Sequence, residues 1–254
     1  MRGDVTMECQ EAVRNIRKGR ILPAHAVLRS VLFVCLLMLS AAGSSAAELK
    51  CENVMISFER QDDIHAEDVC GGVASANMFF RSCGFKPLAS LKITVDRDVE
   101  KVTGYPVFGA FIVATNTILI LDAAGFQKNI EALPVSAIVP WRNWYRSIIA
   151  HEMAHAILRA NVAGELPWLY HEYIAGVVQM ASLPAEDQAV LLRAFPKFYA
   201  QDGAAMLNEF IYAFPPVGFV IGAFANARRF PDRCAHIREV IHRKAIPTVV
   251  NGAK

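Results

Sequence analysis

The stretch Ser147 to Leu158 reads SIIAHEMAHAIL and contains the pattern HExxH, with His151 and His155 four residues apart. On a helix, this spacing places both side chains on one face, one turn from each other. Two imidazoles placed in this way can share one zinc ion, with Zn–N bonds of about 2.0–2.1 Å. Glu152 follows His151 and is rotated from it by roughly 100° about the helix axis. That rotation sets Glu152 beside such an ion, where a general base for an activated water would stand.

The residues around this pattern predict a buried helix. They are apolar on nearly every side: Ile148, Ile149, Met153, Ala154, Ala156, Ile157 and Leu158. Unpaired polar groups are costly inside a protein, so the two histidines and the glutamate need a reason to be there. A bound metal supplies that reason. The alternative is a core helix whose two histidines are satisfied by hydrogen bonds.

The composition is that of a globular chain. Of its 254 residues, 54% are hydrophobic and 20% are charged, which excludes a disordered protein. Residues 1–47 contain six Lys or Arg and three acidic residues, leaving 20 basic (26 − 6) and 21 acidic (24 − 3) residues in the remainder. This balance predicts neither a nucleic-acid partner nor binding to an anionic membrane surface.

The N-terminal residues 1–47 have the order of a secretory signal peptide. A basic region ends at Arg29, an apolar run covers residues 31–39, and small residues follow as far as Ala47. The apolar run is shorter than the roughly 20 residues that a membrane span needs. We therefore expect cleavage after Ala47 and a secreted or periplasmic protein. An uncleaved membrane anchor is the alternative.

The pattern of elements predicts an α+β fold in a single domain, residues 48–254. Residues 48–140 are expected to be strand-rich, with strands at 52–60 and 91–95 and a hairpin formed by 107–114 and 117–121. A helix is expected at 65–82, although Gly71 and Gly72 weaken it. Residues 123–140 contain one glycine and two prolines and are expected to be irregular. Residues 141–254 are expected to be helical, with the HExxH helix at 141–160 and the next helix at 167–181.

Four cysteines remain after the signal segment: Cys51, Cys70, Cys83 and Cys234. An even count in an exported chain predicts two disulfides, with four free thiols as the alternative. On one helix, Cys70 and Cys83 would be roughly 20 Å apart, too far for a bond that needs Cα atoms within about 7 Å. Of the remaining pairings we favour Cys51–Cys70 with Cys83–Cys234.

A catalytic zinc site usually has three protein ligands and a water. Position 161 is Asn, so the third histidine of the metzincin pattern is absent. His171 and Glu172 lie downstream, and both side chains are able to bind zinc. Because adjacent side chains on a helix diverge by about 100°, only one of the two is expected to point at the ion. Periodicity alone does not decide between them.

Residues 172–175 read EYIA and match an ExxA motif. HExxH followed by ExxA or ExxD resembles the gluzincins, the thermolysin-like zinc metallopeptidases, and the likeness covers mainly residues 141–180. The resemblance implies a zincin-like fold in which His151, His155 and Glu172 bind Zn²⁺ and Glu152 is the catalytic base. This sequence departs from the family pattern in the short spacing between His155 and Glu172. It also has Ala175 where an acid would supply a carboxylate behind the ligands.

The resemblance also implies an edge strand that pairs with an extended peptide substrate, for which 117–121 is the candidate. A plain core strand is the alternative for this run. A downstream His or Tyr often stabilises the oxyanion in this family. The available residues are Tyr199, Tyr212, His236 and His242.

The expectation is therefore an exported zinc metallopeptidase that acts on peptides or proteins, without nucleic acid. It would meet a membrane only through an uncleaved signal segment. The alternative is an exported binding or structural protein whose zinc stabilises the fold.

Overall fold

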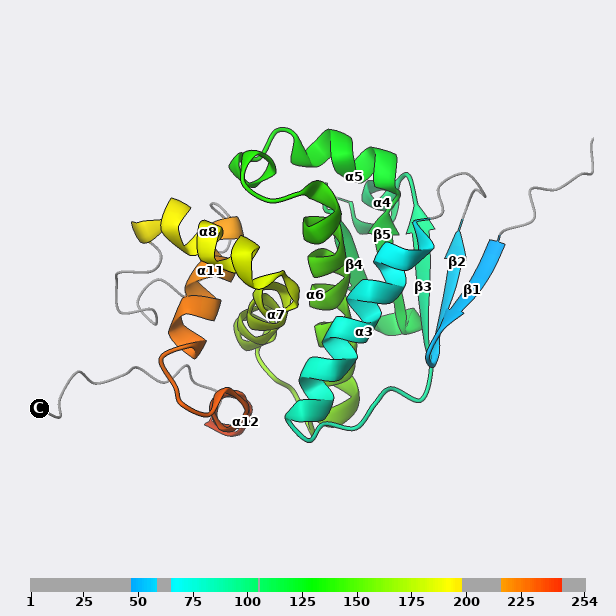
Figure 1. The fold of residues 1–254 in the computed structure, drawn as a ribbon. Helices are drawn as coiled ribbons and strands as arrows, with labels where there is room; N and C mark the ends of the chain where they lie inside the picture. Colours follow the sequence, from blue (N-terminus) through cyan, green and yellow to red (C-terminus); the bar gives the residue numbers. More distant parts are fainter. Residues whose placement is uncertain (1–46, 59–64, 105, 198–215, 244–254) are drawn as a thin grey trace, which may run out of the picture. The chain divides into compact units, whose positions relative to one another are not determined.

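The computed structural model describes residues 47–58, 65–104, 106–197 and 216–243 of the chain (Figure 1). All of these residues belong to one compact unit that begins at Ala46. Residues 1–46 of the predicted signal segment, Tyr199 and Tyr212 lie outside the described residues. No helix in the described part is long and apolar enough to cross a membrane.

A five-stranded mixed sheet forms one side of the unit, with the strand order β1-β2-β3-β5-β4. β1 and β2 are antiparallel, β2, β3 and β5 are parallel, and β4 is antiparallel to β5. The strands are β1 (Ala47–Cys51), β2 (Val54–Phe58), β3 (Leu91–Asp96), β4 (Gly109–Ile112) and β5 (Thr117–Leu121).

The hairpin prediction is confirmed, but the predicted edge strand was wrong. β5 pairs with β3 on one side and β4 on the other, so the free edge beside the hairpin belongs to β4. Residues 118–121 of β5 are all buried, as expected for an internal strand that is apolar on both faces. β4 is only partly buried along its whole length.

Two long helices, α3 (Ala66–Ser82) and α6 (Trp141–Asn161), pack against each other and against the sheet (Figure 1). Gly72 makes their close approach possible, because a Cβ there would lie 2.6 Å from the Arg146 carbonyl oxygen and 2.7 Å from Ile149 Cβ. The glycine that weakens the helix prediction is therefore a packing requirement. The buried carboxylate of Asp68 in α3 also pairs with Arg142 and Arg146 of α6.

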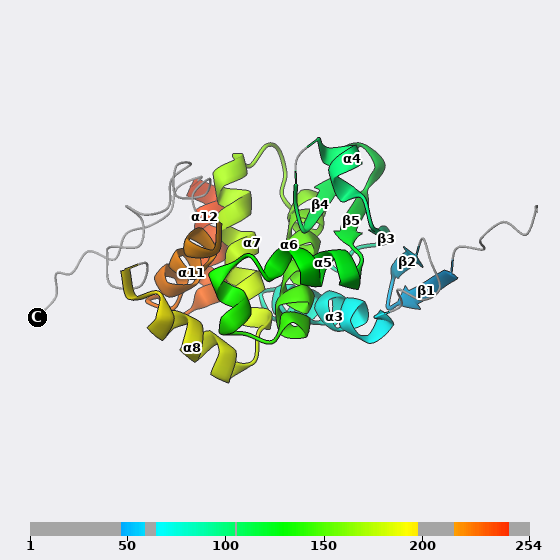
Figure 2. The same ribbon diagram turned by 90° about the horizontal axis from the view of Figure 1, so that it is seen from above.

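The remaining helices lie mostly on the other side of α6 from the sheet (Figures 1 and 2). α7 packs between α6 and α11, and α12 contacts α7. Their bounds are α7 (Trp168–Ser182), α8 (Ala185–Ala194), α11 (Pro216–Ala227) and α12 (Arg233–Arg243), and the short α4 (Val99–Thr103) and α5 (Ala123–Ile130) lie beside the hairpin.

The α+β prediction is confirmed, since all described strands precede residue 122 and the described chain from residue 141 onward is helical. The prediction of an irregular segment at 123–140 was wrong. Residues 123–130 form α5, whose first turn is capped by the Asp122 side chain accepting from the Gly125 amide at 2.7 Å. A 3-10 turn follows at Pro134–Ala137.

The two predicted disulfides are confirmed. Cys51 is bonded to Cys70, with Cα atoms 5.4 Å apart, and Cys83 to Cys234, with Cα atoms 4.9 Å apart. The second bond links the end of α3 to the start of α12. Two disulfides indicate that the protein folds in an oxidising compartment.

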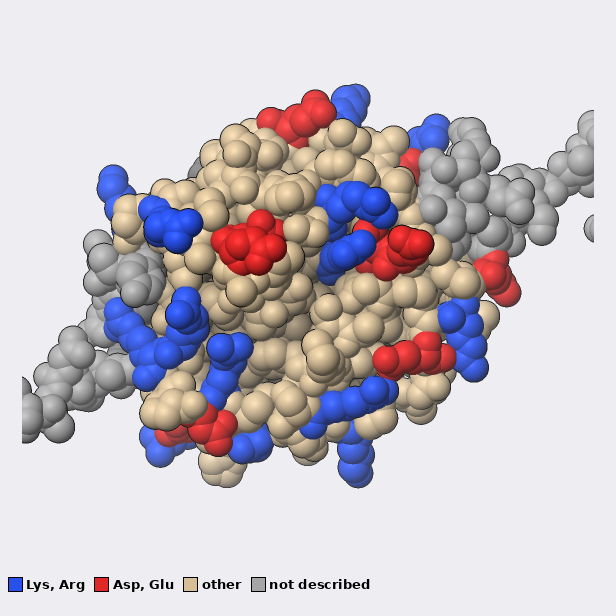
Figure 3. All heavy atoms as spheres, viewed as in Figure 1, with Lys and Arg blue, Asp and Glu red and all other residues tan. Residues whose placement is uncertain are grey.

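Acidic and basic side chains are interspersed over α3 and α6 on the face shown in Figure 3, and basic ones gather towards α12 with acidic ones among them. That face carries no continuous field of one sign over the helices that form the centre of the unit.

Candidate metal centre

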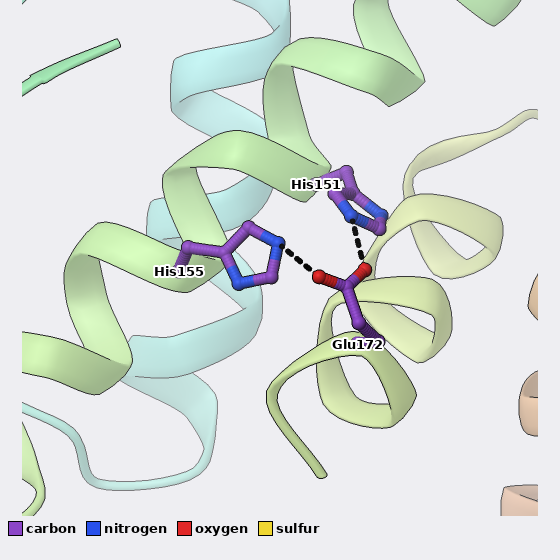
Figure 4. Close-up of side chains that lie close together, drawn as sticks. All are labelled: His151, His155 and Glu172. Atoms are coloured by element: carbon purple, nitrogen blue, oxygen red, sulfur yellow. Dashed lines mark ion pairs between the residues drawn. The ribbon is translucent and has the colours of Figure 1, made fainter. Parts of the chain in front are cut away.

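Two neighbouring helices bring His151, His155 and Glu172 together. The histidines come from consecutive turns of α6, and Glu172, in the second turn of α7, points between them (Figure 4). Glu172 Oε2 lies 3.2 Å from His151 Nε2, and Glu172 Oε1 lies 3.5 Å from His155 Nε2. The possible ligand atoms of the three residues all lie within 4.8 Å of one another.

These distances fit a shared metal ion. In a tetrahedral zinc site with bonds of about 2.05 Å, neighbouring ligand atoms are about 3.3 Å apart. The two measured nitrogen-to-oxygen distances lie on either side of that value. Two imidazoles and one carboxylate also form a donor set that suits zinc. The three side chains could therefore hold one metal ion between α6 and α7.

Gln179 fixes the orientation of one ligand. His151 Nδ1 lies 3.0 Å from Gln179 Oε1, and Gln179 is buried seven residues after Glu172 on the same face of α7. The amide oxygen only accepts hydrogen bonds, so Nδ1 carries a proton and Nε2 is the ring nitrogen that faces the cluster and would bind a metal. Gln179 thus supports a histidine from behind, which an acid at position 175 would do in the family pattern. Ala175 is fully buried in the core.

The two histidines differ in basicity because their charged neighbours differ. Burial opposes the charged form of both. For His151, the nearby Glu172 carboxylate, the charge of Glu152 and the hydrogen bond to Gln179 together outweigh burial and raise the pKa above its ordinary value. For His155, burial dominates and lowers the pKa to about 4. His155 is therefore neutral at physiological pH, as a metal ligand must be.

Glu152 stands beside this cluster and is nearly fully buried. Its pKa is raised to about 7, mainly by burial and also by the charge of Glu172. The charge of His151 and a hydrogen bond from the Phe111 amide oppose this rise. A divalent cation at the three ligands would lower this pKa again. A carboxylate whose pKa lies near neutral pH is suited to accept and release one proton.

The free edge of β4 lies against Glu152. Leu121 N–H donates to the Phe108 carbonyl, so the alternating antiparallel pattern turns the N–H and C=O groups of Gly109 and Phe111 away from β5. The Phe111 amide reaches Glu152 in this way. Gly109 allows the close approach, because a Cβ there would lie 3.1 Å from Glu152 Cγ and 2.6 Å from Ile120 Cδ1.

A cleft of about 490 Å³ opens between β4, α6 and the start of α7. The three metal-cluster residues and Glu152 line it together with Arg159 and His171. The rest of its lining is mostly apolar: Val107, Ala110, Phe111, Val113, Leu166 and Trp168.

The structure distinguishes Glu172 from His171, the two residues that the sequence leaves as alternatives for the third metal ligand. Only Glu172 belongs to the cluster. His171 lines the cleft beside it, with its ring centroid 5.9 Å from that of His155.

Two of the candidate oxyanion residues are ruled out by their positions. His236 is buried away from the cleft, with Nε2 2.7 Å from the Tyr173 hydroxyl, which also lies 2.7 Å from Asn226 Oδ1. His242 is exposed on α12 and does not line the cleft.

Sequence reasoning missed three contributors to the site: Gln179, Arg159 and Gly109. Helical spacing was a usable signal for the first two, since Gln179 lies two turns from Glu172 and Arg159 continues the series of His151 and His155. No signal in the sequence points to Gly109, because its role depends on how the hairpin packs against α6.

The chain belongs to a family of proteins of unknown function, DUF6639, whose profile matches residues 56–250. No curated protein and no solved structure matches the chain.

Proposed function

We propose that this protein is an exported zinc metallopeptidase with a zincin-like fold. The observation that carries the proposal is the position of Glu152. It is buried in the wall of an open cleft, next to the three residues that could hold a metal, without belonging to that cluster.

His151, His155 and Glu172 would hold the zinc. When bound there, zinc supplies Lewis acidity, which lowers the pKa of a coordinated water to about 7 and polarises a carbonyl. Glu152 accepts the proton of the attacking water and returns it to the nitrogen of the leaving amine. Gln179 keeps the His151 ring in the required tautomer. His171 is the cleft residue next to the cluster that can donate a hydrogen bond to the substrate oxygen.

The outward N–H and C=O groups of β4 offer a place for an extended peptide. A substrate strand beside Gly109 and Phe111 would be held in β-augmentation by the outward backbone groups other than the Phe111 amide, which donates to Glu152, and would lie next to Glu152. We therefore assign pairing with the substrate to β4 instead of residues 117–121. The apolar cleft lining would contact the side chains of such a peptide.

The open cleft favours catalysis over the alternative, a zinc clamp that only stabilises the fold. A structural zinc site has four protein ligands and no free position. Among the described residues, the metal cluster has three members, and all three line the cleft.

The proposal is tested by loading the purified full chain with zinc and mixing it with peptide pools, with and without a chelator. Cleavage should stop with the chelator and return with added zinc. Glu152→Gln should keep its zinc and lose hydrolysis by about 10²–10⁴-fold, the loss typical of a missing general base. Glu131→Gln, at an exposed acid away from the cleft, is the matched control.

Near-normal cleavage by Glu152→Gln, or cleavage that survives the chelator, would contradict the mechanism. Zinc that is bound and raises the melting temperature without any cleavage would instead support the structural clamp.

A further inference from the structure

Arg159 brings a permanent positive charge to the cleft. It lies on α6 four residues after His155, so it shares the face of the helix that carries the metal cluster, about 6 Å further along the axis. It lines the cleft together with Trp168 and His171. It lies close enough to His171 for its charge to act on that ring.

This charge has no acidic partner in the part of the chain that the structure describes. The two carboxylates that line the cleft are engaged elsewhere, Glu172 with the histidines and Glu152 with the Phe111 amide. Arg159 is also the only Lys or Arg among the described residues that line the cleft. An exposed guanidinium in a mostly apolar cleft is suited to bind an anionic ligand group.

We propose that Arg159 determines the specificity of the cleft by binding a carboxylate of the peptide substrate. This inference rests on the proposed peptidase function. The guanidinium fork matches a carboxylate with two parallel hydrogen bonds. An extended peptide advances about 3.3 Å per residue, so the offset of about 6 Å along α6 places that carboxylate within about two residues of the scissile bond. An Asp or Glu side chain and a peptide C-terminus supply the same chemistry.

Arg159 also lies in the last turn of α6, where a cation interacts favourably with the helix dipole. That interaction stabilises the helix but gives no preference among ligands. A purely structural role therefore predicts that replacing Arg159 changes stability and leaves the choice of peptide unaltered.

Binding is measured with the zinc-loaded full chain carrying Glu152→Gln, so that peptides are retained without being cleaved. Random hexapeptide pools are compared that contain either Glu or Gln and end in either a carboxylate or an amide. We expect about tenfold stronger retention of the pools with the recognised carboxylate, the value of a hydrogen-bonded charge in a partly exposed site. A preference lost on amidation identifies the C-terminus as the ligand, and one lost on exchange of Glu for Gln identifies the side chain.

In the same background, Arg159→Gln should abolish this preference and Arg159→Lys should keep part of it. Arg193→Gln, at an exposed arginine on α8, should leave it intact. Equal retention of all pools by the protein that keeps Arg159, or a preference that survives Arg159→Gln, overturns the inference.

Hydrolysis by the chain with Glu152 restored separates this inference from the proposed function. Arg159→Gln should raise KM for carboxylate-bearing peptides about tenfold and leave kcat nearly unchanged, the pattern of lost uniform binding. An Arg159-dependent binding preference without any cleavage would refute the peptidase and leave the carboxylate site standing. Active cleavage with the same KM in Arg159→Gln would refute the carboxylate site alone.

Discussion

Gly109 of the edge strand faces Glu152 of the motif helix so closely that a single added Cβ on Gly109 would come within 3.1 Å of Glu152 Cγ. The same Cβ would lie 2.6 Å from Ile120 Cδ1. The backbone of β4 is therefore part of the wall that fixes the carboxylate. An alanine at this position would push Glu152 Cγ by a few tenths of an ångström and would force the end of the Ile120 side chain to turn aside.

Gly109→Ala is expected to lower kcat/KM by about 10–100-fold, because small displacements of a catalytic group are costly. Zinc content should stay the same, since the three ligands come from α6 and α7. Steady-state kinetics and metal analysis on the same preparation check both parts. A fully active Gly109→Ala protein would show that the contact does not position Glu152.

The choice between Glu172 and His171 predicts opposite results for two adjacent substitutions. Glu172→Ala removes a member of the cluster and should lose zinc on dialysis, whereas His171→Ala should retain it and lose activity only. Metal content after dialysis is the measurement. Zinc retained by Glu172→Ala and lost by His171→Ala would move the ligand to His171.

The neighbouring glycines of α3 predict opposite effects on stability. Gly72→Ala should destabilise the protein by about 1–3 kcal/mol, because its Cβ overlaps the Arg146 carbonyl and Ile149. At Gly71 a Cβ would meet Arg146 side-chain atoms at 3.5 Å or more, an ordinary contact. Gly71→Ala should therefore stabilise the helix by about 0.5–1 kcal/mol. Urea unfolding of the two variants decides, and equal effects would argue against the close packing of α3 on α6.

His236 predicts a loss of stability in mild acid. Burial lowers its pKa to about 4, with a small opposing effect of Glu239 on the same helix, while the unfolded chain titrates near 6.5. As pH falls from 6.5 to 4, the unfolded state binds a proton that the folded state does not, so folding stability decreases. The loss is roughly 3 kcal/mol, at about 1.4 kcal/mol per pKa unit, and is complete below pH 4.

Unfolding free energies measured across this range should show a shallower slope for His236→Gln than for the unsubstituted protein. His242→Gln, an exposed histidine on the same helix, should leave the slope unchanged. Equal slopes for the two variants would contradict the prediction.

The candidate site was predictable where it depends on local helical geometry. The spacing of His151, Glu152 and His155 is enough to place them, because a turn of helix leaves little freedom. Glu172 followed only through its motif, since it comes from a second helix. The free edge was assigned to the wrong strand because pairing of β5 with β3 is a long-range event. The fully apolar run 118–121 was the signal for an internal strand.

Other parts of the fold could not be predicted because their cause lies in tertiary packing. β1 starts at Ala47, where the small residues of the signal pattern obscure a strand. α5 was hidden by Gly125, although the Asp122 cap was present in the sequence. Gly72 lowers helix propensity locally, and only the approach of α6 shows why a glycine is needed there.

The Cys83–Cys234 bond joins two distant parts of the chain and completes the fold. It closes a loop over a separation of 151 residues that includes His151, Glu152, His155 and Glu172. Restricting an unfolded loop of that length is worth about 5 kcal/mol by chain entropy. Disulfides form and persist in an oxidising compartment. The covalent ring around the candidate site therefore closes only after Cys83, the site residues and Cys234 have all reached such a compartment, so the full stability of the site depends on the redox state of its surroundings.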